Sequence, residues 1–279
     1  MKKLIFALFF LAVACDRGSK RPIVVGSKNF TESVILGELL AQKLEAQKCA
    51  VDRKLNMGGT FVCDGAINAG QIDAYVEYSG TALSAILKDP RANLVGNYDH
   101  KGLHWGPRLG FNNTFAMIVR GADAQQQHLQ KISDLASVAA SYQPGFGYEF
   151  VERPDGWPGL QQAYGLQFAK TPKTMDLGLT YKALASNEVD LIAGNSTDGL
   201  ISSLGLVVLD DDRRFFPAYD AAVVYRKDTD EKCRAASRAF ESLGDSIDDA
   251  TMRRLNYEVD GKKRDVAEVV REFLGAKSR

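Results

Sequence analysis

Histidine and cysteine are scarce in this sequence, and their spacing does not suit a metal site. Among 279 residues there are only three histidines, His100, His104 and His128, and four cysteines. No Cys-x-x-Cys pair occurs, although structural zinc sites commonly use such closely spaced ligands. We therefore predict no metal site, and we predict no cofactor.

The chain also lacks an excess of either charge. It has 35 lysines and arginines against 35 aspartates and glutamates, so the formal net charge at pH 7 is zero. Nucleic-acid-binding proteins usually carry a basic surplus that matches the phosphate backbone. The composition therefore argues against a nucleic-acid partner. With 45% hydrophobic and 25% charged residues, it is typical of a globular protein.

No hydrophobic run is long enough to cross a membrane. The apolar stretch Leu4–Val13 follows Lys2 and Lys3 and holds ten residues, which would span only about 15 Å as a helix. A short apolar segment behind positive residues is typical of a signal peptide. It ends in small residues before Cys15, which resembles the lipobox of bacterial lipoproteins. That resemblance implies a signal peptide of residues 1–14 and lipidation of Cys15.

Asp16 follows the predicted lipidated cysteine. An aspartate at this position resembles the signal that retains Gram-negative lipoproteins at the inner membrane. Residues 15–21 would then form a short polar tether, with the mature protein in the periplasm or its extracytoplasmic equivalent. Plain secretion with an unmodified Cys15 is the alternative.

Three cysteines remain in the mature chain. An exported compartment permits disulfides. Cys49 and Cys63 are close in sequence and could pair, which would leave Cys233 alone. The sequence does not determine this connectivity.

Strand and helix patterns alternate along the mature chain. Ile23–Gly26 has the apolar run of a buried strand, and the leucines after Glu32 recur at helical spacing. Asn29, three residues before Glu32, resembles the start of a capping box, and a polar loop at a helix start suits anionic ligand groups. Strand patterns return at Val51–Leu55 and Ile72–Tyr78. This alternation predicts an α/β fold with a parallel sheet and helices on both faces.

The order of elements favours two lobes. We predict that residues 22–115 and 217–279 form lobe I and that residues 116–216 form lobe II, inserted into lobe I. Two crossing strands, near Phe115–Arg120 and Ala218–Arg226, would form the hinge.

Three further segments carry specific expectations. Lys88–Pro107 is polar and lacks a clear period, so we predict irregular structure there. Pro144–Gly159 is rich in glycine, proline and aromatic residues, which is typical of a long functional loop. Ser196–Asp198 is predicted to cap a helix, and Asp198 is expected to serve that cap more than the ligand.

Five short motifs then occur in an order that resembles a known family. They are Gly26-Ser27-Lys28-Asn29-Phe30-Thr31-Glu32, Glu77-Tyr78-Ser79-Gly80-Thr81, Phe111-Asn112-Asn113-Thr114-Phe115, Ser196-Thr197-Asp198-Gly199 and Phe215-Phe216-Pro217-Ala218-Tyr219. Together they resemble the substrate-binding proteins of ABC importers for glycine betaine, choline and related osmoprotectants, over nearly the whole mature chain.

The resemblance implies a fold of the periplasmic-binding-protein type II kind, with two lobes, a two-strand hinge and a ligand cleft between the lobes. It implies a monomer that delivers its ligand to a separate ABC permease and ATPase subunit. The expected ligand is a quaternary-amine zwitterion such as glycine betaine, with choline, carnitine and ergothioneine as related candidates.

The resemblance also assigns residues to the cationic head of such a ligand. A quaternary ammonium has no N–H to donate, so aromatic faces hold it, each contact being worth up to about 2 kcal/mol. Tyr78, Phe115 and Tyr219 match family positions that form the aromatic cage, and Asn113 matches a position near the head group. The ordinary alternatives are core tyrosines for Tyr78 and Tyr219, and a turn residue for Asn113.

One position departs from the family pattern. Family members usually have a tyrosine directly before the Ser-Thr-Asp run, and this chain has Asn195. Asn195 offers hydrogen bonds but no aromatic face, so one wall of the cage is missing or comes from elsewhere, with Tyr148 and Trp157 as candidates. The change favours a bulkier or more polar cation, for example a betaine with a heterocyclic side group.

The carboxylate end of the ligand has its own matching residues. Lys28, Thr81 and Arg153 match family positions for the anionic tail, and carboxylates favour arginine or lysine donors. Because Arg153 lies on the inserted lobe, only closure of the lobes would offer all three donors at once. The alternatives are a surface ion pair of Arg153 with Glu149 or Glu152, and a solvated Lys28.

Three other functions stay open from the sequence. Asn195 would also fit a binding protein for another cationic or amino-acid-like metabolite. The same pair of lobes could serve a sensor. An enzyme is disfavoured, because the motifs offer Lys28, Glu32 and Glu77 but no convincing pair of nucleophile and base.

Overall fold

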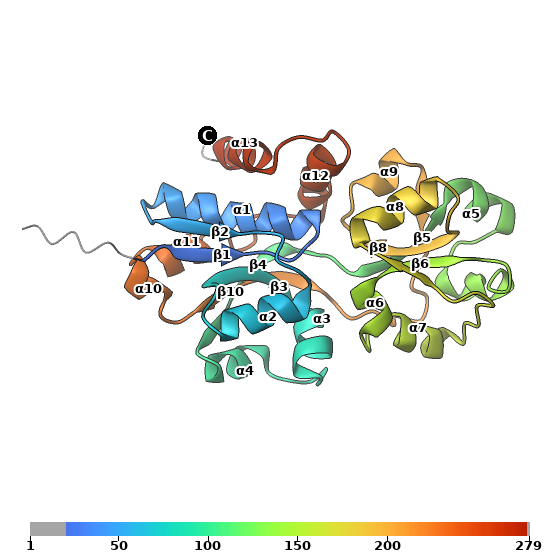
Figure 1. Cartoon of the computed structure of the whole chain (residues 1–279), viewed down its shortest axis with the longest axis horizontal. Helices are drawn as coiled ribbons and strands as arrows, with labels where there is room; N and C mark the ends of the chain where they lie inside the picture. Colours follow the sequence, from blue (N-terminus) through green and yellow to red (C-terminus); the bar gives the residue numbers. More distant parts are fainter. Residues whose placement is uncertain (1–20, 278–279) are drawn as a thin grey trace, which may run out of the picture.

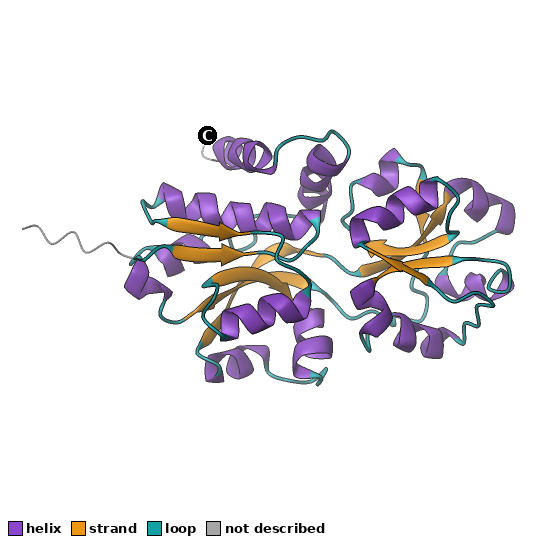
Figure 2. Cartoon of the chain, in the orientation of Figure 1, coloured by secondary structure: helices purple, strands orange, loops and turns teal. Residues whose placement is uncertain are grey.

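The computed structural model describes residues 21–277, which form two lobes lying side by side (Figure 1). Each lobe contains one five-stranded sheet, with helices on both of its faces (Figure 2). The predicted signal peptide, the lipidation site Cys15 and the tether up to residue 20 lie outside the described residues. None of the helices in the described part of the chain has the length and apolar character that a membrane span requires.

Lobe I is built on a sheet with the strand order β2-β1-β3-β10-β4. β1 pairs in parallel with β2 and β3, whereas β10 runs antiparallel to β3 and β4. The strands are β1 (Ile23–Gly26), β2 (Val51–Lys54), β3 (Ala74–Tyr78), β4 (Leu103–Asn112) and β10 (Asp220–Arg226). The helices are α1 (Thr31–Ala46), α2 (Thr60–Asn68), α3 (Ser79–Thr81) with a π-helical continuation (Ala82–Leu87), α4 (Leu94–His100), α10 (Thr229–Lys232), α11 (Ala236–Glu241), α12 (Asp249–Asp260) and α13 (Val266–Lys277).

Lobe II has the strand order β7-β6-β8-β5-β9. Its strands are β5 (Phe115–Arg120), β6 (Pro144–Gly147), β7 (Lys173–Met175), β8 (Leu191–Asn195) and β9 (Leu206–Val208). Its helices are α5 (Gly121–Gln127), a 3₁₀ helix (Ile132–Ser137), α6 (Tyr148–Glu152), α7 (Trp157–Tyr164), α8 (Leu177–Ala185) and α9 (Leu200–Ser203). The mixed α/β class predicted from the alternation of patterns is confirmed in both lobes.

The chain passes between the lobes twice, through residues 113–114 and through residues 209–219. The expectation that Phe115–Arg120 and Ala218–Arg226 cross as strands is wrong in detail. β5 belongs wholly to the sheet of lobe II, and β10 belongs wholly to the sheet of lobe I. Because ladder hydrogen bonds hold each strand within one sheet, the backbone free to bend lies in the two links.

Residues 88–107 are more regular than the sequence predicts, since they contain α4 and the start of β4. Gly106 and Pro107 obscure the strand pattern. β4 lies at the edge of its sheet and pairs with β10 alone, with shifts of register along the pair. An edge strand tolerates the missing N–H of proline, and bulges break the alternation of side chains.

The segment Pro144–Gly159 is not the long loop that its composition suggests. It contains β6, α6 and the start of α7. Gly145 lies in β6, where an added Cβ would stand 2.6 Å from Val189. This glycine therefore marks close packing of a buried strand, and the aromatic residues Phe146 and Trp157 are core residues of lobe II.

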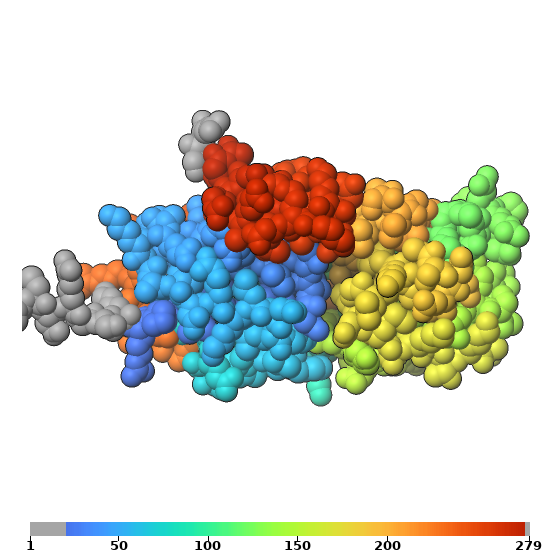
Figure 3. Space-filling model, turned by 45° about the horizontal axis from the view of Figure 1, so that its top comes forward, coloured from blue at the N-terminus to red at the C-terminus, as the bar shows by residue number. Residues whose placement is uncertain are grey.

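Each lobe has its own hydrophobic core, and Phe115 and Phe216 pack against both cores. The C-terminal helices α12 and α13 pack on α1. In Figure 3 this segment, coloured red, covers lobe I up to the boundary with lobe II. The C-terminal segment thus brings residues from the end of the chain close to the lobe boundary.

A disulfide joins Cys49, just after α1, to Cys233, between α10 and α11. The suggested pairing of Cys49 with Cys63 is wrong, because Cys63 is a free, buried thiol on α2. Proximity in sequence is a poor guide here: the two bonded cysteines are 184 residues apart. The disulfide links the first helix of lobe I to the segment that follows lobe II in the sequence.

Candidate ligand-binding cleft

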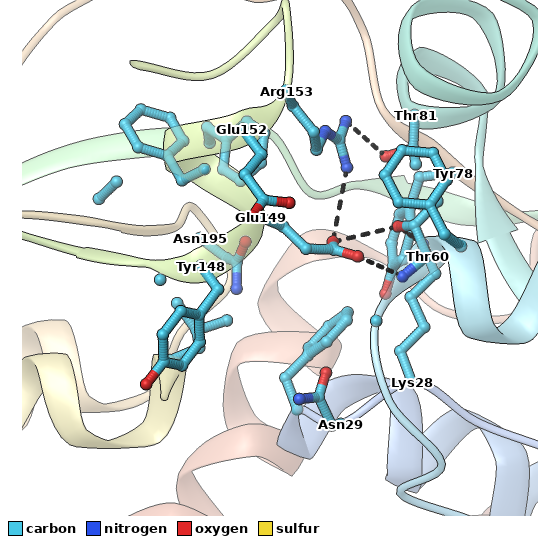
Figure 4. Close-up of a pocket in the computed structure, with 18 of the residues that line it drawn as sticks. Lys28, Asn29, Thr60, Tyr78, Thr81, Tyr148, Glu149, Glu152, Arg153 and Asn195 are labelled. Atoms are coloured by element: carbon cyan, nitrogen blue, oxygen red, sulfur yellow. Dashed lines mark hydrogen bonds and ion pairs between the residues drawn. The ribbon is translucent and has the colours of Figure 1, made fainter. Parts of the chain in front are cut away.

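A cleft with a volume of about 280 Å³ lies between the lobes. All eight residues predicted to bind the ligand line it: Lys28, Tyr78, Thr81, Asn113, Phe115, Arg153, Asn195 and Tyr219. Figure 4 shows side chains of lobe I, including Lys28, Thr60 and Thr81, facing Glu149 and Arg153 of lobe II across this space. The structure therefore brings together residues that lie far apart in the sequence.

The topology explains this convergence. Lys28 follows β1 and Tyr78 ends β3, two parallel neighbours in the sheet of lobe I. Asn195 ends β8 of lobe II. Ligands of open α/β sheets bind outside the carboxyl ends of strands, and here both sheets present such ends to the same cleft.

Arg153 is buried and joins the two lobes. Its Nε and Nη2 donate to both carboxylate oxygens of Asp155, at 2.9 Å and 2.5 Å, and its Nη2 also donates to Thr81 Oγ1 of lobe I at 3.1 Å. The hydroxyl of Tyr219 donates to Asp155 at 2.6 Å. Arg153 is therefore not the surface residue of the alternative interpretation. Its Nη1 group lies 3.9 Å from Glu149 and makes no closer ion pair among the described residues.

Lys28 is also buried and paired. Its Nζ donates to Glu77 Oε1 at 2.6 Å and to Thr60 Oγ1 at 3.0 Å. The interpretation as a solvated loop lysine is therefore wrong. A ligand carboxylate at Lys28 would share this cation with Glu77.

Glu149 is a cleft residue that the sequence analysis missed. It extends from α6 of lobe II to the start of α2 in lobe I, where its carboxylate accepts hydrogen bonds from the backbone N–H and the hydroxyl of Thr60. A side chain on Gly59 would collide with this carboxylate. Nothing in the sequence around Gly59 indicates a partner from the other lobe.

Two of the predicted cage rings already carry a protein cation. Lys28 Nζ lies 5.2 Å from the centre of the Tyr78 ring, and the guanidinium carbon of Arg153 lies 5.1 Å from the centre of the Phe115 ring. A second cation beside the same faces would be repelled. A ligand ammonium would therefore need the other faces or edges of these rings.

Asn195 stands beside Phe115, because the two residues are partners in the antiparallel register of β5 and β8. Directly paired residues project to the same side of a sheet. An aromatic residue at position 195 would thus extend the Phe115 wall. Of the two substitutes suggested for this wall, Tyr148 lines the cleft but is 55% exposed, whereas Trp157 packs in the core of lobe II.

Glu32 does not form the expected capping box with Asn29. α1 begins at Thr31, and no side chain caps it. The Glu32 carboxylate instead lies buried behind the cleft and accepts four hydrogen bonds, from Tyr78, Asn113, Thr197 and Asn256. Burial raises the pKa of Glu32, and these four hydrogen bonds oppose that rise. The sequence pattern was present, but tertiary contacts gave the carboxylate other donors.

Asp198 does not cap α9, which begins after it without a side-chain cap. Its Oδ2 accepts from the Tyr181 hydroxyl at 2.5 Å and from the backbone N–H of Asn195 at 2.9 Å. Burial raises the pKa of Asp198 to about 7, and the nearby carboxylates of Glu32 and Asp260 add to this rise, while the two hydrogen bonds oppose it. Asp198 therefore supports the end of β8 that carries Asn195.

The stability of the fold should depend on the ionisation of Asp198. A pKa that is higher in the folded state favours the protonated form there, so this contribution is fully present below about pH 4 and is lost as the pH rises through about 7. For a fully buried group this corresponds to at most about 4 kcal/mol. Because both hydrogen bonds go to Oδ2, Asp198→Asn can keep them.

We expect denaturant unfolding between pH 4 and pH 8 to show a smaller loss of stability for Asp198→Asn than for the wild type. The exposed Asp52 of β2 provides the control, and Asp52→Asn should follow the wild-type curve. Parallel curves for Asp198→Asn and the wild type would contradict the expectation.

Residues 21–276 match the family described as the substrate-binding domain of ABC-type glycine betaine transport systems. The chain belongs to this family. Members of this family bind a solute for transport. The chain is therefore a binding protein and not an enzyme, as the sequence predicted.

Several known proteins are similar over most of this substrate-binding protein. An ergothioneine transport permease/ergothioneine-binding protein of Helicobacter pylori is 36% identical over 263 residues, which cover 91% of this chain and 47% of that protein. The chain thus spans about half the length of that relative. A glycine-betaine-binding protein of Pseudomonas aeruginosa is 34% identical, with 90% of this chain and 86% of that protein covered.

Solved structures confirm the predicted fold of this substrate-binding protein. A crystal structure of a glycine betaine/carnitine/choline ABC transporter protein superposes with a TM-score of 0.71 at 30% identity, over 91% of this chain and 98% of the other. The glycine-betaine-bound closed form of a lactococcal binding protein superposes with a TM-score of 0.68 at 13% identity, covering 92% of this chain and 96% of the other. The fold is that of a type II periplasmic binding protein.

Proposed function

We propose that this substrate-binding protein binds a quaternary-amine zwitterion in the cleft between its lobes and delivers it to the permease and ATPase subunit of an ABC importer. The observation that carries the proposal is the composition of the cleft. Arginine, lysine and threonine donors from both lobes meet there beside aromatic rings. Such a site can accept a carboxylate at one end and a cation without N–H donors at the other.

The cleft also favours a betaine that carries further hydrogen-bond donors. Glu149, Glu152 and Asp176 line it in addition to the paired cations, and carboxylates accept N–H groups. Asn195 leaves room where family members usually have a ring. A heterocyclic betaine such as ergothioneine would use both features, and the Helicobacter pylori relative is named for that compound. Glycine betaine, choline and carnitine are smaller candidates for the same site.

In this proposal Lys28, Thr81 and Arg153 hold the carboxylate, and Tyr78, Phe115, Asn113 and Tyr219 surround the cationic head. Lipidated Cys15 and the following tether would anchor a monomer to the outer face of the cytoplasmic membrane. The link at residues 113–114 and the longer link at residues 209–219 would allow the lobes to open and close around the ligand.

Ligand binding to the wild type tests the proposal directly. Thermal unfolding and calorimetry with glycine betaine, choline, carnitine and ergothioneine should show binding of at least one quaternary amine. Basic amino acids should not bind. Binding of a basic amino acid and of none of the quaternary amines would overturn the proposal and favour the alternative metabolite class.

Asn195→Tyr should change the affinities for small and for large ligands in opposite directions. The added ring would stand beside Phe115, so a trimethylammonium head gains a contact that is worth about 1 kcal/mol, or roughly fivefold in affinity. A heterocyclic betaine should bind more weakly, because the ring takes up part of the cleft. Calorimetry with glycine betaine and ergothioneine measures both effects. Asn97→Tyr on α4, outside the cleft lining, should change neither affinity.

A further inference from the structure

Glu32 stands out because it is a buried carboxylate without a cationic partner. Its side chain is 1% exposed. It makes no ion pair with a lysine or arginine of residues 21–277, whereas the neighbouring Glu77 is paired with Lys28. An isolated buried charge is costly unless hydrogen bonds or another charge compensate it. The stability of the lobe therefore does not explain why the Glu32 carboxylate is buried without a cation.

The hydrogen bonds around Glu32 favour its charged form. Oε1 accepts from the Tyr78 hydroxyl and from Asn113 Nδ2, both at 2.7 Å. Oε2 accepts from the Thr197 hydroxyl at 2.5 Å and from Asn256 Nδ2 at 3.0 Å. Two of these groups are amide N–H donors, which cannot accept a proton from a neutral carboxyl group. Four donors on two oxygens fit an ionised carboxylate.

Two of the four donors connect Glu32 to the cleft. Tyr78 and Asn113 both line it, and Glu32 lies directly behind them. Because Asn113 donates its Nδ2 to Glu32, its amide oxygen Oδ1 is turned away from that carboxylate. Oδ1 is buried and has no hydrogen-bond partner in the described part of the chain. The carboxylate thus sets the orientation of the amide of a residue that lines the cleft.

We infer that Glu32 is the counter-charge by which the cleft selects a cationic head group, acting through Tyr78 and Asn113. The inference rests on the proposed function and names a residue that adds to the lining carboxylates Glu149, Glu152 and Asp176 in favouring positive charge at the head group. Glu32 does not line the cleft, so it covers no ring face and takes up no space that a ligand would need. It places negative charge at the hydroxyl edge of the Tyr78 ring and fixes the Asn113 amide beside it. The aromatic rings alone would also accept an uncharged head of the same shape.

The inference is tested with ligands that differ only in head-group charge. In tert-butylacetate, carbon replaces the ammonium nitrogen of glycine betaine, so the shape and the carboxylate are kept. Each quaternary amine that the wild type binds is compared by calorimetry with its carbon isostere. We expect the wild type to prefer the cation and Glu32→Gln to lose about tenfold or more of that preference. Affinity for the isostere, whose head group is uncharged, should change little.

Glu32→Gln suits this test because it can keep most of the hydrogen bonds. Its amide oxygen can accept from Tyr78 and Asn113. Its N–H₂ group would face the Thr197 hydroxyl, which can accept instead of donating, and the amide of Asn256, which would have to turn over and give up its hydrogen bond to the Thr197 carbonyl. If Glu32→Gln does not fold, the double variant Glu32→Gln/Thr197→Val replaces the hydroxyl beside the new N–H₂ group by a methyl group of similar size. Glu38→Gln, on the same helix and paired with Arg53, should keep the wild-type preference.

The outcomes separate the inference from the function on which it rests. A wild type that binds no quaternary amine would overturn the proposed function together with the inference. A wild type that binds the cation, with a Glu32→Gln variant that keeps the same preference over the isostere, overturns the inference alone. Equal weakening of both ligands would also overturn it, because Glu32 would then act only by holding Thr197 and so the closed lobes.

Discussion

Arg153→Ala should weaken binding of a carboxylate-bearing ligand by about 30-fold or more, since truncating one partner of a buried charge pair between two binding partners costs about 2–5 kcal/mol. The change leaves Asp155 buried with only the Tyr219 hydroxyl as a partner among the contacts described above. It also breaks the contact between Arg153 and Thr81 that joins the lobes. Choline, which has no carboxylate, should lose less affinity than glycine betaine. Calorimetry with the two ligands measures the difference.

The structure changes the expected result for choline. From the sequence alone, Arg153 is a donor to the ligand, and choline should hardly be affected. Because Arg153 also links the lobes and covers one face of Phe115, closure itself should become weaker for every ligand. Arg120→Ala is the matched control, since Arg120 pairs with Asp190 and Asp123 within lobe II and does not line the cleft. Equal losses for both ligands would show that Arg153 serves closure and not the carboxylate.

Removal of the disulfide should have the largest effect on stability. Replacing Cys49 and Cys233 by alanine frees a loop of 184 residues, and loss of such a crosslink costs about 2–5 kcal/mol in the chain-entropy description. For a chain of this size the unfolding temperature should fall by roughly 10 °C. Thermal unfolding of the double variant measures the fall.

Ligand affinity below the unfolding temperature should be retained in this double variant. Cys49 lies beyond the C-terminal end of α1, whereas the cleft residues cluster around its N-terminal end. Cys63→Ala is the control, because it removes a buried thiol but keeps the disulfide. A fall in unfolding temperature as large for Cys63→Ala as for the double variant would contradict a stabilising role of the crosslink.

The strongly periodic elements could be predicted from the sequence. The buried run of β1 and the helical spacing of the leucines in α1 reflect local rules, since Leu36, Leu40 and Leu44 all face the core. β4 could not be predicted, because its glycine and proline are tolerated only where a strand has a free edge. β4 pairs with β10 on one side, and its other edge is free. β10 lies more than 100 residues later in the chain, so no local pattern shows that β4 is an edge strand.

The candidate site was predictable only in part. The family resemblance assigned eight residues that line one cleft, and six of these eight lie within the five motifs. They did not reveal that Glu77 and Asp155 hold the two cations. They also did not reveal Glu149, which reaches the other lobe, or Glu32, which looked like a helix cap. Asp155 lies only two residues from Arg153. Glu77, Glu149 and Glu32 find their partners 46 or more residues away in the sequence, at a separation that no local pattern can encode.

The sequence by itself determined the α/β class, the family and the residues that meet at the cleft, because these follow from periodicity and from motifs of a few residues. Only the tertiary structure decided which partners those residues have. The fold joins Cys49 to Cys233 in a disulfide, places Asn195 beside Phe115 and buries Glu32 against the Tyr78 hydroxyl. Burial and the direction of hydrogen bonds depend on neighbours from both lobes, and those neighbours meet only when the chain is folded.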